Sequence, residues 1–319
     1  MHALEKQCRF ELNRFNLKHK EIESVFIGGG TPSTVDPELY TDLFALLDPY
    51  LSDNCEITTE ANPNSASKEW LEGMHDLGIN RISFGVQSFH TPKLKLLNRA
   101  HSAQEAKEAI INAYDIGIKN ISLDLIYATA GDTKELLQAD LKEAFALPIN
   151  HLSAYALTIE EGTPFEKKPA MSQEQLEHTH FLFETIKKHG FLHYEISNFG
   201  TYQSAHNLGY WNYKEYIGLG SGAVGKLHNK RLYPNTHIQE YIKDPLFQKE
   251  EELTTQDVKI EKIFLGFRSI IGVDSSLLNT QERQRADLLV EENKLSYNQG
   301  KYYNEDFLLA DEITLFLTS

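Results

Sequence analysis

The sequence predicts an α/β fold: a partial barrel of parallel strands followed by a smaller C-terminal domain. Short β-branched or aromatic runs alternate with helical patterns, and these runs start near residues 24, 56, 81, 120, 151 and 193. The gaps of 32, 25, 39, 31 and 42 residues each have room for a crossover helix. Strands and helices that alternate in this way form right-handed βαβ units and a parallel sheet. A doubly wound open sheet is the alternative.

The individual elements follow from local patterns. Strands are expected at 24–27, 56–60, 81–86, 120–127, 151–157 and 193–196. Helices are expected at 4–15, 37–47, 67–77, 102–117, 134–146 and 172–190. Ser102 with Glu105, and Ser172 with Gln175, have the spacing of a residue that caps a helix N-terminus and its partner.

The pattern changes near Asp244, which predicts a domain boundary. A helical pattern at 258–268 and another at 283–289 precede two short strands, 294–296 and 301–303. The sequence therefore predicts a barrel domain over 1–243 and a small winged-helix-like domain over 244–319. A helical cap on the barrel is the alternative, and the acidic run 250–252 is expected to be a solvated linker.

Composition narrows the function classes. The 319 residues carry 31 Lys and Arg against 46 Asp and Glu, a net charge of −15. Such a chain is poorly suited to neutralising the phosphates of a nucleic acid or the headgroups of an anionic membrane. No run of about 18 apolar residues predicts a membrane span, and the N-terminus has no signal-peptide core. Two cysteines are too few for the disulfide framework of a small secreted domain. We therefore expect a cytoplasmic protein.

Residues 25–33 read V-F-I-G-G-G-T-P-S, and they are the most informative stretch. Three consecutive glycines, Gly28, Gly29 and Gly30, follow a strand and precede Thr31. Because glycine loses the most backbone entropy on folding, such a run favours a loop where a ligand approaches bare backbone. A plain strand-to-helix turn is the alternative.

Polar residues stand near the ends of successive strands, where α/β barrels build their sites. They are Glu60, Gln87, Asp124 and the stretch 155–158. A carboxylate inside an apolar strand is costly unless it is paired or contacts a ligand. A structural hydrogen-bond anchor is the alternative for any single residue of this kind, but several at one rim favour a pocket. Its carboxylates and amide suit a ligand with an amino group and hydroxyls better than one with phosphates.

The histidines do not predict a metal site, because no pair has zinc-ligand spacing. His206 lies in the segment H-N-L-G-Y-W (206–211), which we expect to be a loop. This segment is either aromatic core packing or a binding loop for a flat hydrophobic molecule.

These residues together resemble the radical S-adenosylmethionine (SAM) superfamily. Within it the chain is similar to the oxygen-independent coproporphyrinogen III oxidase-like group, and nearest to its HemW-type heme chaperones. The resemblance covers nearly the whole chain and rests on these motifs: G-G-G-T-P-S (28–33), E-x-N-P (60–63), S-F-G-V-Q-S-F (83–89), R-x-H-S-x-x-E-A (99–106), D-L-I-Y (124–127), L-S-A-Y-x-L-T-I-E-x-G-T-P (152–164), H-Y-E-I-S-N-F (193–199), H-N-L-G-Y-W (206–211) and G-L-G-S-G-A (218–223). The last three favour the chaperones over the oxidase.

The resemblance implies a partial (β/α)6 barrel with a small C-terminal domain, and it implies cofactor residues. The SAM site would be formed by Gly28, Gly29, Gly30, Thr31, Glu60, Gln87, Arg99 and Asp124. Glu60 and Asp124 would accept hydrogen bonds from amino or ribose hydroxyl groups, and Arg99 would pair with the carboxylate. His206 would be the axial ligand of heme iron.

The chain departs from the family pattern in three places. The C-x-x-x-C-x-x-C motif that holds the [4Fe–4S] cluster is absent, since Cys8 and Cys55 do not match it. We expect that loop, and the first strand, upstream of the first helix of an intact protein. The usual G-L-P-G-Q-T is A-T-A-G-D-T (128–133), and the usual G-A-H-S is G-A-V-G (222–225).

Three functions therefore compete. The first is a heme chaperone that binds heme and transfers it to recipient apo-hemoproteins such as respiratory enzymes. The second is a radical SAM oxidase that decarboxylates coproporphyrinogen III. The third is a truncated chain with neither activity. The recipient and the oligomeric state do not follow from the sequence.

Overall fold

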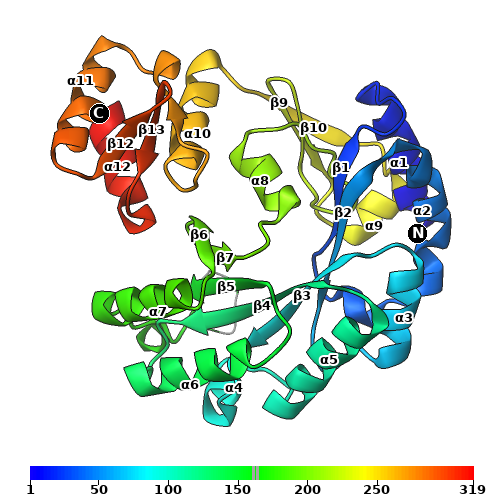
Figure 1. The fold of residues 1–319 in the computed structure, drawn as a ribbon. Helices are drawn as coiled ribbons and strands as arrows, with labels where there is room; N and C mark the ends of the chain where they lie inside the picture. The colour runs from blue at the N-terminus through cyan, green and yellow to red at the C-terminus, as the bar shows by residue number, and fades with distance from the viewer. Residues whose placement is uncertain (160–161, 163–164) are drawn as a thin grey trace. The chain divides into compact units, whose positions relative to one another are not determined.

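The computed structural model describes residues 1–159, 162 and 165–319, and its chain divides into two compact units (Figure 1). The first unit comprises Met1–Glu23, Tyr40–Asn54 and Ala205–Ser319. The second comprises Ser24–Leu39 and Cys55–Ser204. Part of one family motif, at residues 160, 161, 163 and 164, lies outside the described residues. The boundary expected at residues 243 and 244 stays a prediction.

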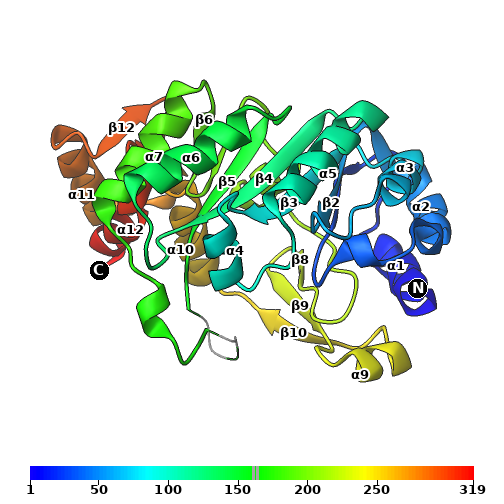
Figure 2. The same ribbon diagram turned by 90° about the horizontal axis from the view of Figure 1, so that it is seen from below.

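A seven-stranded sheet runs through the second unit and curls into the predicted partial barrel (Figure 2). Neighbouring strands follow the order β1 (Ile22–Ile27), β2 (Leu51–Ala61), β3 (Arg81–Gln87), β4 (Asn120–Tyr127), β5 (His151–Ala156), β7 (Asn198–Gly200) and β6 (Leu192–Glu195). Strands β2 to β5 pair in parallel, as their helical connections require. The α/β fold class is confirmed.

The last predicted strand is not another parallel unit. β6 and β7 form an antiparallel hairpin, and β7 pairs antiparallel with β5. Only two residues separate Glu195 from Asn198, which is too few for a crossover connection. The extended stretch was therefore predicted correctly, but its direction in the sheet was not.

Five α-helices connect the strands of this unit: α3 (Lys68–Asp76), α4 (Thr91–Leu96), α5 (Ala103–Ile116), α6 (Lys134–Phe145) and α7 (Leu176–Lys188). The capping box at Ser102 is confirmed, and it starts α5. The cap predicted at Ser172 is wrong, because Gln175 precedes α7 and Ser172 Oγ instead donates to the Leu157 carbonyl at 2.6 Å. The short helix α4 was not predicted.

Alternating side chains give this sheet two different faces. One set of residues is apolar and fully buried, among them Ile82, Phe84, Leu123 and Leu152. Burying each of these side chains contributes about 1.5–3 kcal/mol. Since α5 packs on β3 and β4, we assign this set to the helix-covered side. The opposite side, here called the inner face, carries polar residues.

The first unit contains α1 (His2–Arg14), α2 (Thr41–Leu47), α8 (Ala205–Trp211), α9 (Ile238–Lys243) and an antiparallel sheet of β8 (Gly225–Leu227), β9 (Lys230–Pro234) and β10 (Gln248–Glu252). Residues 250–252 belong to β10, so the predicted acidic linker is wrong. Their charge is tolerated because the side chains are exposed and Glu250 pairs with Arg14 and with Lys230.

Near the C-terminus, α10 (Thr255–Gly266), β11 (Val273–Asp274), α11 (Thr280–Glu291), β12 (Leu295–Asn298), β13 (Lys301–Asn304) and α12 (Ala310–Thr318) enclose a small core of their own. Its centre includes Ile263, Phe267, Tyr302 and Leu317. The predicted order of two helices and a hairpin is confirmed, and β11 adds a third strand. Within the described residues, none of the helices has the length and apolar character needed to cross a membrane.

Candidate functional site

The sheet register places the predicted carboxyl groups on the inner face. Glu60 of β2 lies beside Ser83 of β3, and Asp124 of β4 lies beside Ser153 of β5. Ser83 Oγ donates to Asp124 Oδ1 at 3.2 Å, which links the two positions. Glu60 and Asp124 are each about half-buried. The sequence predicted both carboxyls at one rim, and the structure places them on one face of the sheet, with β3 between their strands.

Burial makes these carboxyls unusually basic. It raises the pKa of Asp124 to about 6, although hydrogen bonding with Ser153 and Ser83 opposes the shift and the charge of Glu60 adds to it. Burial also raises the pKa of Glu60, and the Gly29 amide opposes that shift. Two carboxyl groups with raised pKa values on one face favour a ligand that brings positive charge or hydrogen-bond donors.

The glycine run adopts a conformation that other residues resist. Gly29 and Gly30 have φ angles of 81° and 67°, a region costly for residues with a Cβ. A Cβ on Gly28 would lie 2.5 Å from Phe26 Cε1 and 3.2 Å from Glu60 Cδ. The Gly29 N–H donates to Glu60 Oε2 at 3.3 Å.

Space remains above this loop. A Cβ on Gly29 or Gly30 would meet nothing within 4 Å, so the backbone is open to a ligand. Thr31 follows directly and precedes the 3₁₀ turn Pro32–Thr34. The prediction of a ligand loop at these residues fits both its conformation and its exposure.

Gln87 and Arg99 complete the predicted set. Gln87 ends β3 with a φ of 67° at a shift in the β3–β4 register, and its side chain is buried. A non-glycine residue with such a φ is strained, and strain of this kind concentrates at functional sites. Burial lowers the pKa of Arg99, and the charge of Asp124 opposes the shift. Arg99 and Asp124 therefore interact electrostatically.

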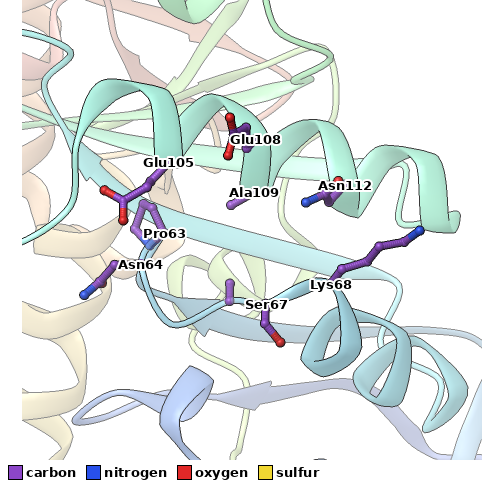
Figure 3. Close-up of a pocket in the computed structure, with 9 residues that line it drawn as sticks. Pro63, Asn64, Ser67, Lys68, Glu105, Glu108, Ala109 and Asn112 are labelled. Carbon is purple, nitrogen blue, oxygen red and sulfur yellow. The ribbon is translucent and has the colours of Figure 1, made fainter.

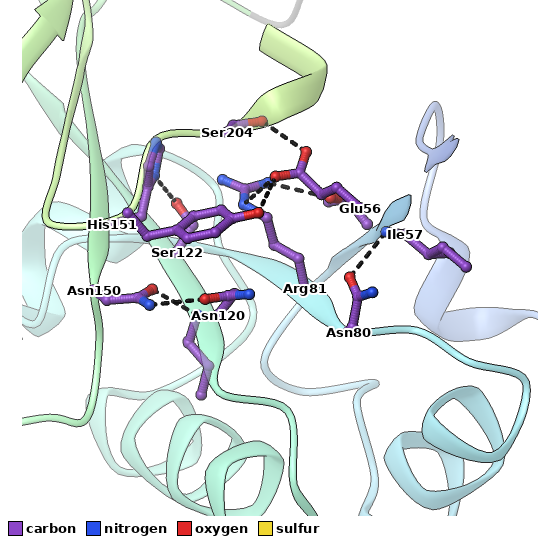
Figure 4. A network of polar contacts seen from close by, with 12 residues as sticks. Glu56, Ile57, Asn80, Arg81, Asn120, Ser122, Asn150, His151 and Ser204 are labelled. Carbon is purple, nitrogen blue, oxygen red and sulfur yellow. Dashed lines mark hydrogen bonds and ion pairs between the residues drawn. The ribbon is translucent and has the colours of Figure 1, made fainter. Parts of the chain in front are cut away.

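A buried polar network on the same sheet was not predicted (Figure 4). Glu56 accepts from Tyr202 Oη at 2.7 Å and from Ser204 Oγ at 3.0 Å. The Arg81 guanidinium lies 4.0 Å from the same carboxylate. In the sequence, this network is indicated only by polar residues that alternate along β2 and β3. The same alternation is expected for a strand with one face exposed to solvent.

The network continues through His151. Ser122 Oγ lies 2.7 Å from His151 Nδ1, and His151 Nε2 lies 2.7 Å from Tyr194 Oη. Burial lowers the pKa of His151 well below its usual value, so the imidazole is neutral. Because all three residues are buried, we interpret the chain as support for the sheet and not as a nucleophile with its base.

His206 lies on α8 and not in a loop, so that prediction is corrected. The motif at residues 206–211 contains no proline, and it is helical throughout, including Gly209. The His206 ring lies 4.9 Å from the Tyr210 ring at 90°, as an i, i+4 pair allows. His206 belongs to the first compact unit, whereas the eight SAM candidates belong to the second.

The cysteines do not fit an iron–sulfur cluster. Cys8 and Cys55 are buried and belong to different compact units. Burial raises the pKa of the Cys8 thiol to about 11, which disfavours the thiolate that a metal requires. In the part of the chain that the structure describes, no group of three or more His, Cys, Asp or Glu is placed to hold a metal ion.

The altered loop at 128–133 folds around a buried charge pair. Lys93 Nζ lies 2.8 Å from Asp132 Oδ1, and both side chains are almost fully buried. Asp132 Oδ2 also accepts from the Thr129 N–H at 2.9 Å. This buried ion pair explains why the loop carries Asp132 where the family pattern has glutamine.

A shallow polar pocket lies elsewhere, on the helices (Figure 3). It is lined from α3, α5 and the loop before α3, by residues that include Asn64, Lys68, Glu105 and Glu108. None of the predicted site residues lines it. We assign it no function.

Comparisons with known proteins agree with this fold. The Radical SAM superfamily model matches residues 11–144. The solved coproporphyrinogen III oxidase (HemN) of Escherichia coli, a radical SAM enzyme, superposes with a TM-score of 0.81 at 18% identity, over 100% of this chain and 82% of that one. The class is therefore a radical SAM-type barrel, and membership implies SAM and a [4Fe–4S] cluster.

Curated relatives define the family more narrowly. Heme chaperone HemW of Escherichia coli is 39% identical over 78% of this chain and 69% of its own length. HemW of Bacillus subtilis is 34% identical over 79% and 71%, and that of Haemophilus influenzae is 30% identical over 100% and 89%. This chain belongs to the HemW family, and the resemblance inferred from its motifs is confirmed.

Proposed function

We propose that this chain binds heme and transfers it to recipient apo-hemoproteins in the cytoplasm, and that it binds SAM on the inner face of its sheet. The relatives named heme chaperone HemW, at 30–39% identity, support the heme function. The observation that carries it in this chain is the placement of His206 on α8. A half-buried imidazole held beside an aromatic ring suits an axial heme ligand.

Each SAM residue has a role that its surroundings support. The charge and polarity of Glu60 and Asp124 suit an ammonium group and ribose hydroxyls. Arg99 is the cation available for a carboxylate. The exposed backbone of Gly29 and Gly30 allows the methionyl end to approach closely. SAM supplies a sulfonium-activated adenosyl group when bound. Cys8 and Cys55 do not fit the ligand set of a [4Fe–4S] cluster.

The heme proposal is tested by titrating heme into the full chain and following the Soret band. We expect His206→Ala to weaken binding by at least tenfold. His180→Ala, on an exposed position of α7, is the matched control and should bind like the wild type. Unchanged binding by the His206 variant would remove this residue from the proposal.

The SAM proposal is tested separately by calorimetric titration. We expect Asp124→Asn to weaken SAM binding, since an amide replaces one acceptor oxygen with a donor. Asp115→Asn, exposed on α5, is the control. Equal affinities for the wild type and both variants would show that SAM does not use the inner face at Asp124.

Oxidative decarboxylation of coproporphyrinogen III is the second candidate. The HemN superposition favours it, but at 18% identity that likeness shows the fold alone. Conversion of coproporphyrinogen III by the chain in the presence of SAM and a reductant would support the oxidase.

A further inference from the structure

Two buried residues of the β6–β7 hairpin have unsatisfied oxygens. Glu195 ends β6 and Asn198 begins β7, with exposed fractions of 1% and 5%. Among the described residues, Glu195 Oε1 and Asn198 Oδ1 have no hydrogen-bond partner. The other carboxyl oxygen, Glu195 Oε2, accepts a long hydrogen bond of 3.3 Å from the Ser197 N–H.

The sheet register places these two residues in the same row as Asp124. Asp124 pairs with Ser153, Ser153 pairs with Asn198, and Asn198 pairs with Glu195. Residues paired across strands point to the same side of a sheet, so all four lie on the inner face. With strands about 4.8 Å apart, the backbone of Glu195 lies roughly 14 Å from that of Asp124.

Hydrogen bonding along the row leaves the two oxygens as acceptors. Tyr155 hydrogen-bonds with Ser153 and Asn198, and Asn198 also hydrogen-bonds with Glu195. Both contacts with Asn198 lower the pKa of the partner group. Among the described residues, Asn198 Oδ1 is the buried amide atom that has no hydrogen-bond partner. Burial raises the pKa of Glu195 to about 7, although hydrogen bonding with Ser197 and Asn198 opposes the shift.

The hairpin does not need these polar groups to fold. On its other side Phe199 stacks on His193 at 4.1 Å and meets Phe183 edge-on. An unsatisfied buried acceptor is destabilising, whereas an apolar pair of similar shape is nearly neutral or stabilising. Two such oxygens on paired residues are thus unfavourable in the free chain and become favourable when a donor reaches them.

We propose that Glu195 and Asn198 form an acceptor site on the inner face that receives N–H groups of a bound small molecule. The proposal extends the proposed function, on which it rests for the ligand class. Two sources share this chemistry: the amino group of the adenosyl moiety of SAM, and the pyrrole N–H groups of a metal-free tetrapyrrole. Heme offers no pyrrole N–H and is not expected to use this pair.

The test measures binding of SAM, metal-free protoporphyrin IX and heme to the full chain, together with its thermal unfolding. The variants are Glu195→Met and Asn198→Leu, which remove the acceptors. Glu195→Gln keeps one acceptor oxygen and should restore part of the affinity. Glu72→Met, on an exposed position of α3, is the matched control.

We expect both apolar variants to bind one donor-bearing probe at least tenfold more weakly, to bind heme like the wild type, and to unfold at the same temperature or higher. Weakened SAM binding identifies the adenosyl group, and weakened protoporphyrin binding identifies a tetrapyrrole. Unchanged affinity for both probes, or a clearly lower unfolding temperature for both apolar variants, overturns the inference. If the wild type binds SAM and heme, and the variants bind every probe with the affinity of the wild type, only this inference fails. If it binds none of the three probes, the proposed function fails as well.

Discussion

Replacing His151 with phenylalanine should destabilise the sheet by an amount that its hydrogen bonds determine. The imidazole is 1% exposed and contacts Ser122 Oγ and Tyr194 Oη, each at 2.7 Å. Phenylalanine fills the space but removes one hydrogen bond from each hydroxyl, and Tyr194 Oη keeps the Ser204 N–H at 3.4 Å. At about 1–3 kcal/mol for each buried hydroxyl that loses this hydrogen bond, we expect His151→Phe to lower the free energy of unfolding by roughly 2–6 kcal/mol.

The pH dependence of this loss has a definite sign. The folded His151 stays neutral because burial lowers its pKa, whereas the unfolded histidine takes up a proton below its ordinary pKa of about 6.5. The wild type therefore loses stability as pH falls below about 6.5. Between pH 7.5 and 5.5 this loss is about 1.4 kcal/mol. His151→Phe lacks that term, so its deficit relative to the wild type should shrink at the lower pH.

The assay is urea unfolding followed by circular dichroism at both pH values. The triple variant Ser122→Ala, His151→Phe, Tyr194→Phe serves as the comparison, because it leaves fewer unmatched groups and should lose less than the sum of the single changes. A His151→Phe variant within 0.5 kcal/mol of the wild type, or a deficit that grows at pH 5.5, would refute the reasoning.

Three further predictions concern the ligand loop and its surroundings. SAM affinity should fall as pH drops through about 6, because protonation removes the charge of Asp124 and turns one of its acceptor oxygens into a donor; calorimetry across pH would show this, and Asp124→Asn should lack the dependence. Gly28→Ala should weaken SAM binding, because its Cβ would meet the Phe26 ring at 2.5 Å; recovery in a variant that also carries Phe26→Ala would identify the clash, and full affinity in the single variant would argue against it. Lys93→Met should cost about 3–5 kcal/mol of stability by stranding the buried charge of Asp132. Chemical denaturation would measure that cost, and a much smaller loss would mean that water reaches the carboxylate.

Much of the site followed from residues close together in the sequence. The glycine run at 28–30 was readable because its conformational requirement is local. Glu60 and Asp124 were readable because parallel strands bring their carboxyl ends to one edge. The capping box at Ser102 was found for the same reason, since a helix cap needs only four adjacent residues.

Other features depended on partners far along the chain. The direction of the β6–β7 hairpin, the burial of Glu195 and the strand formed by residues 248–252 were not readable, because strand pairing and burial are set by contacts between distant segments. The Ser172 hydroxyl was assigned to a helix cap, yet its carbonyl partner lies 15 residues earlier. The hydrogen-bond acceptor of a serine hydroxyl therefore depends on the tertiary fold and not only on the adjacent residues.

By itself the sequence determined the fold class, the glycine loop, the candidate carboxyls and the family, because these depend on local conformation, strand periodicity and short motifs. Only the tertiary structure decided which polar residues share the inner face and which of them lack partners. It raised the pKa of Asp124 to about 6 through burial and left two acceptor oxygens unsatisfied on the β6–β7 hairpin. Desolvation and hydrogen bonding depend on three-dimensional neighbours, and no local pattern encodes them.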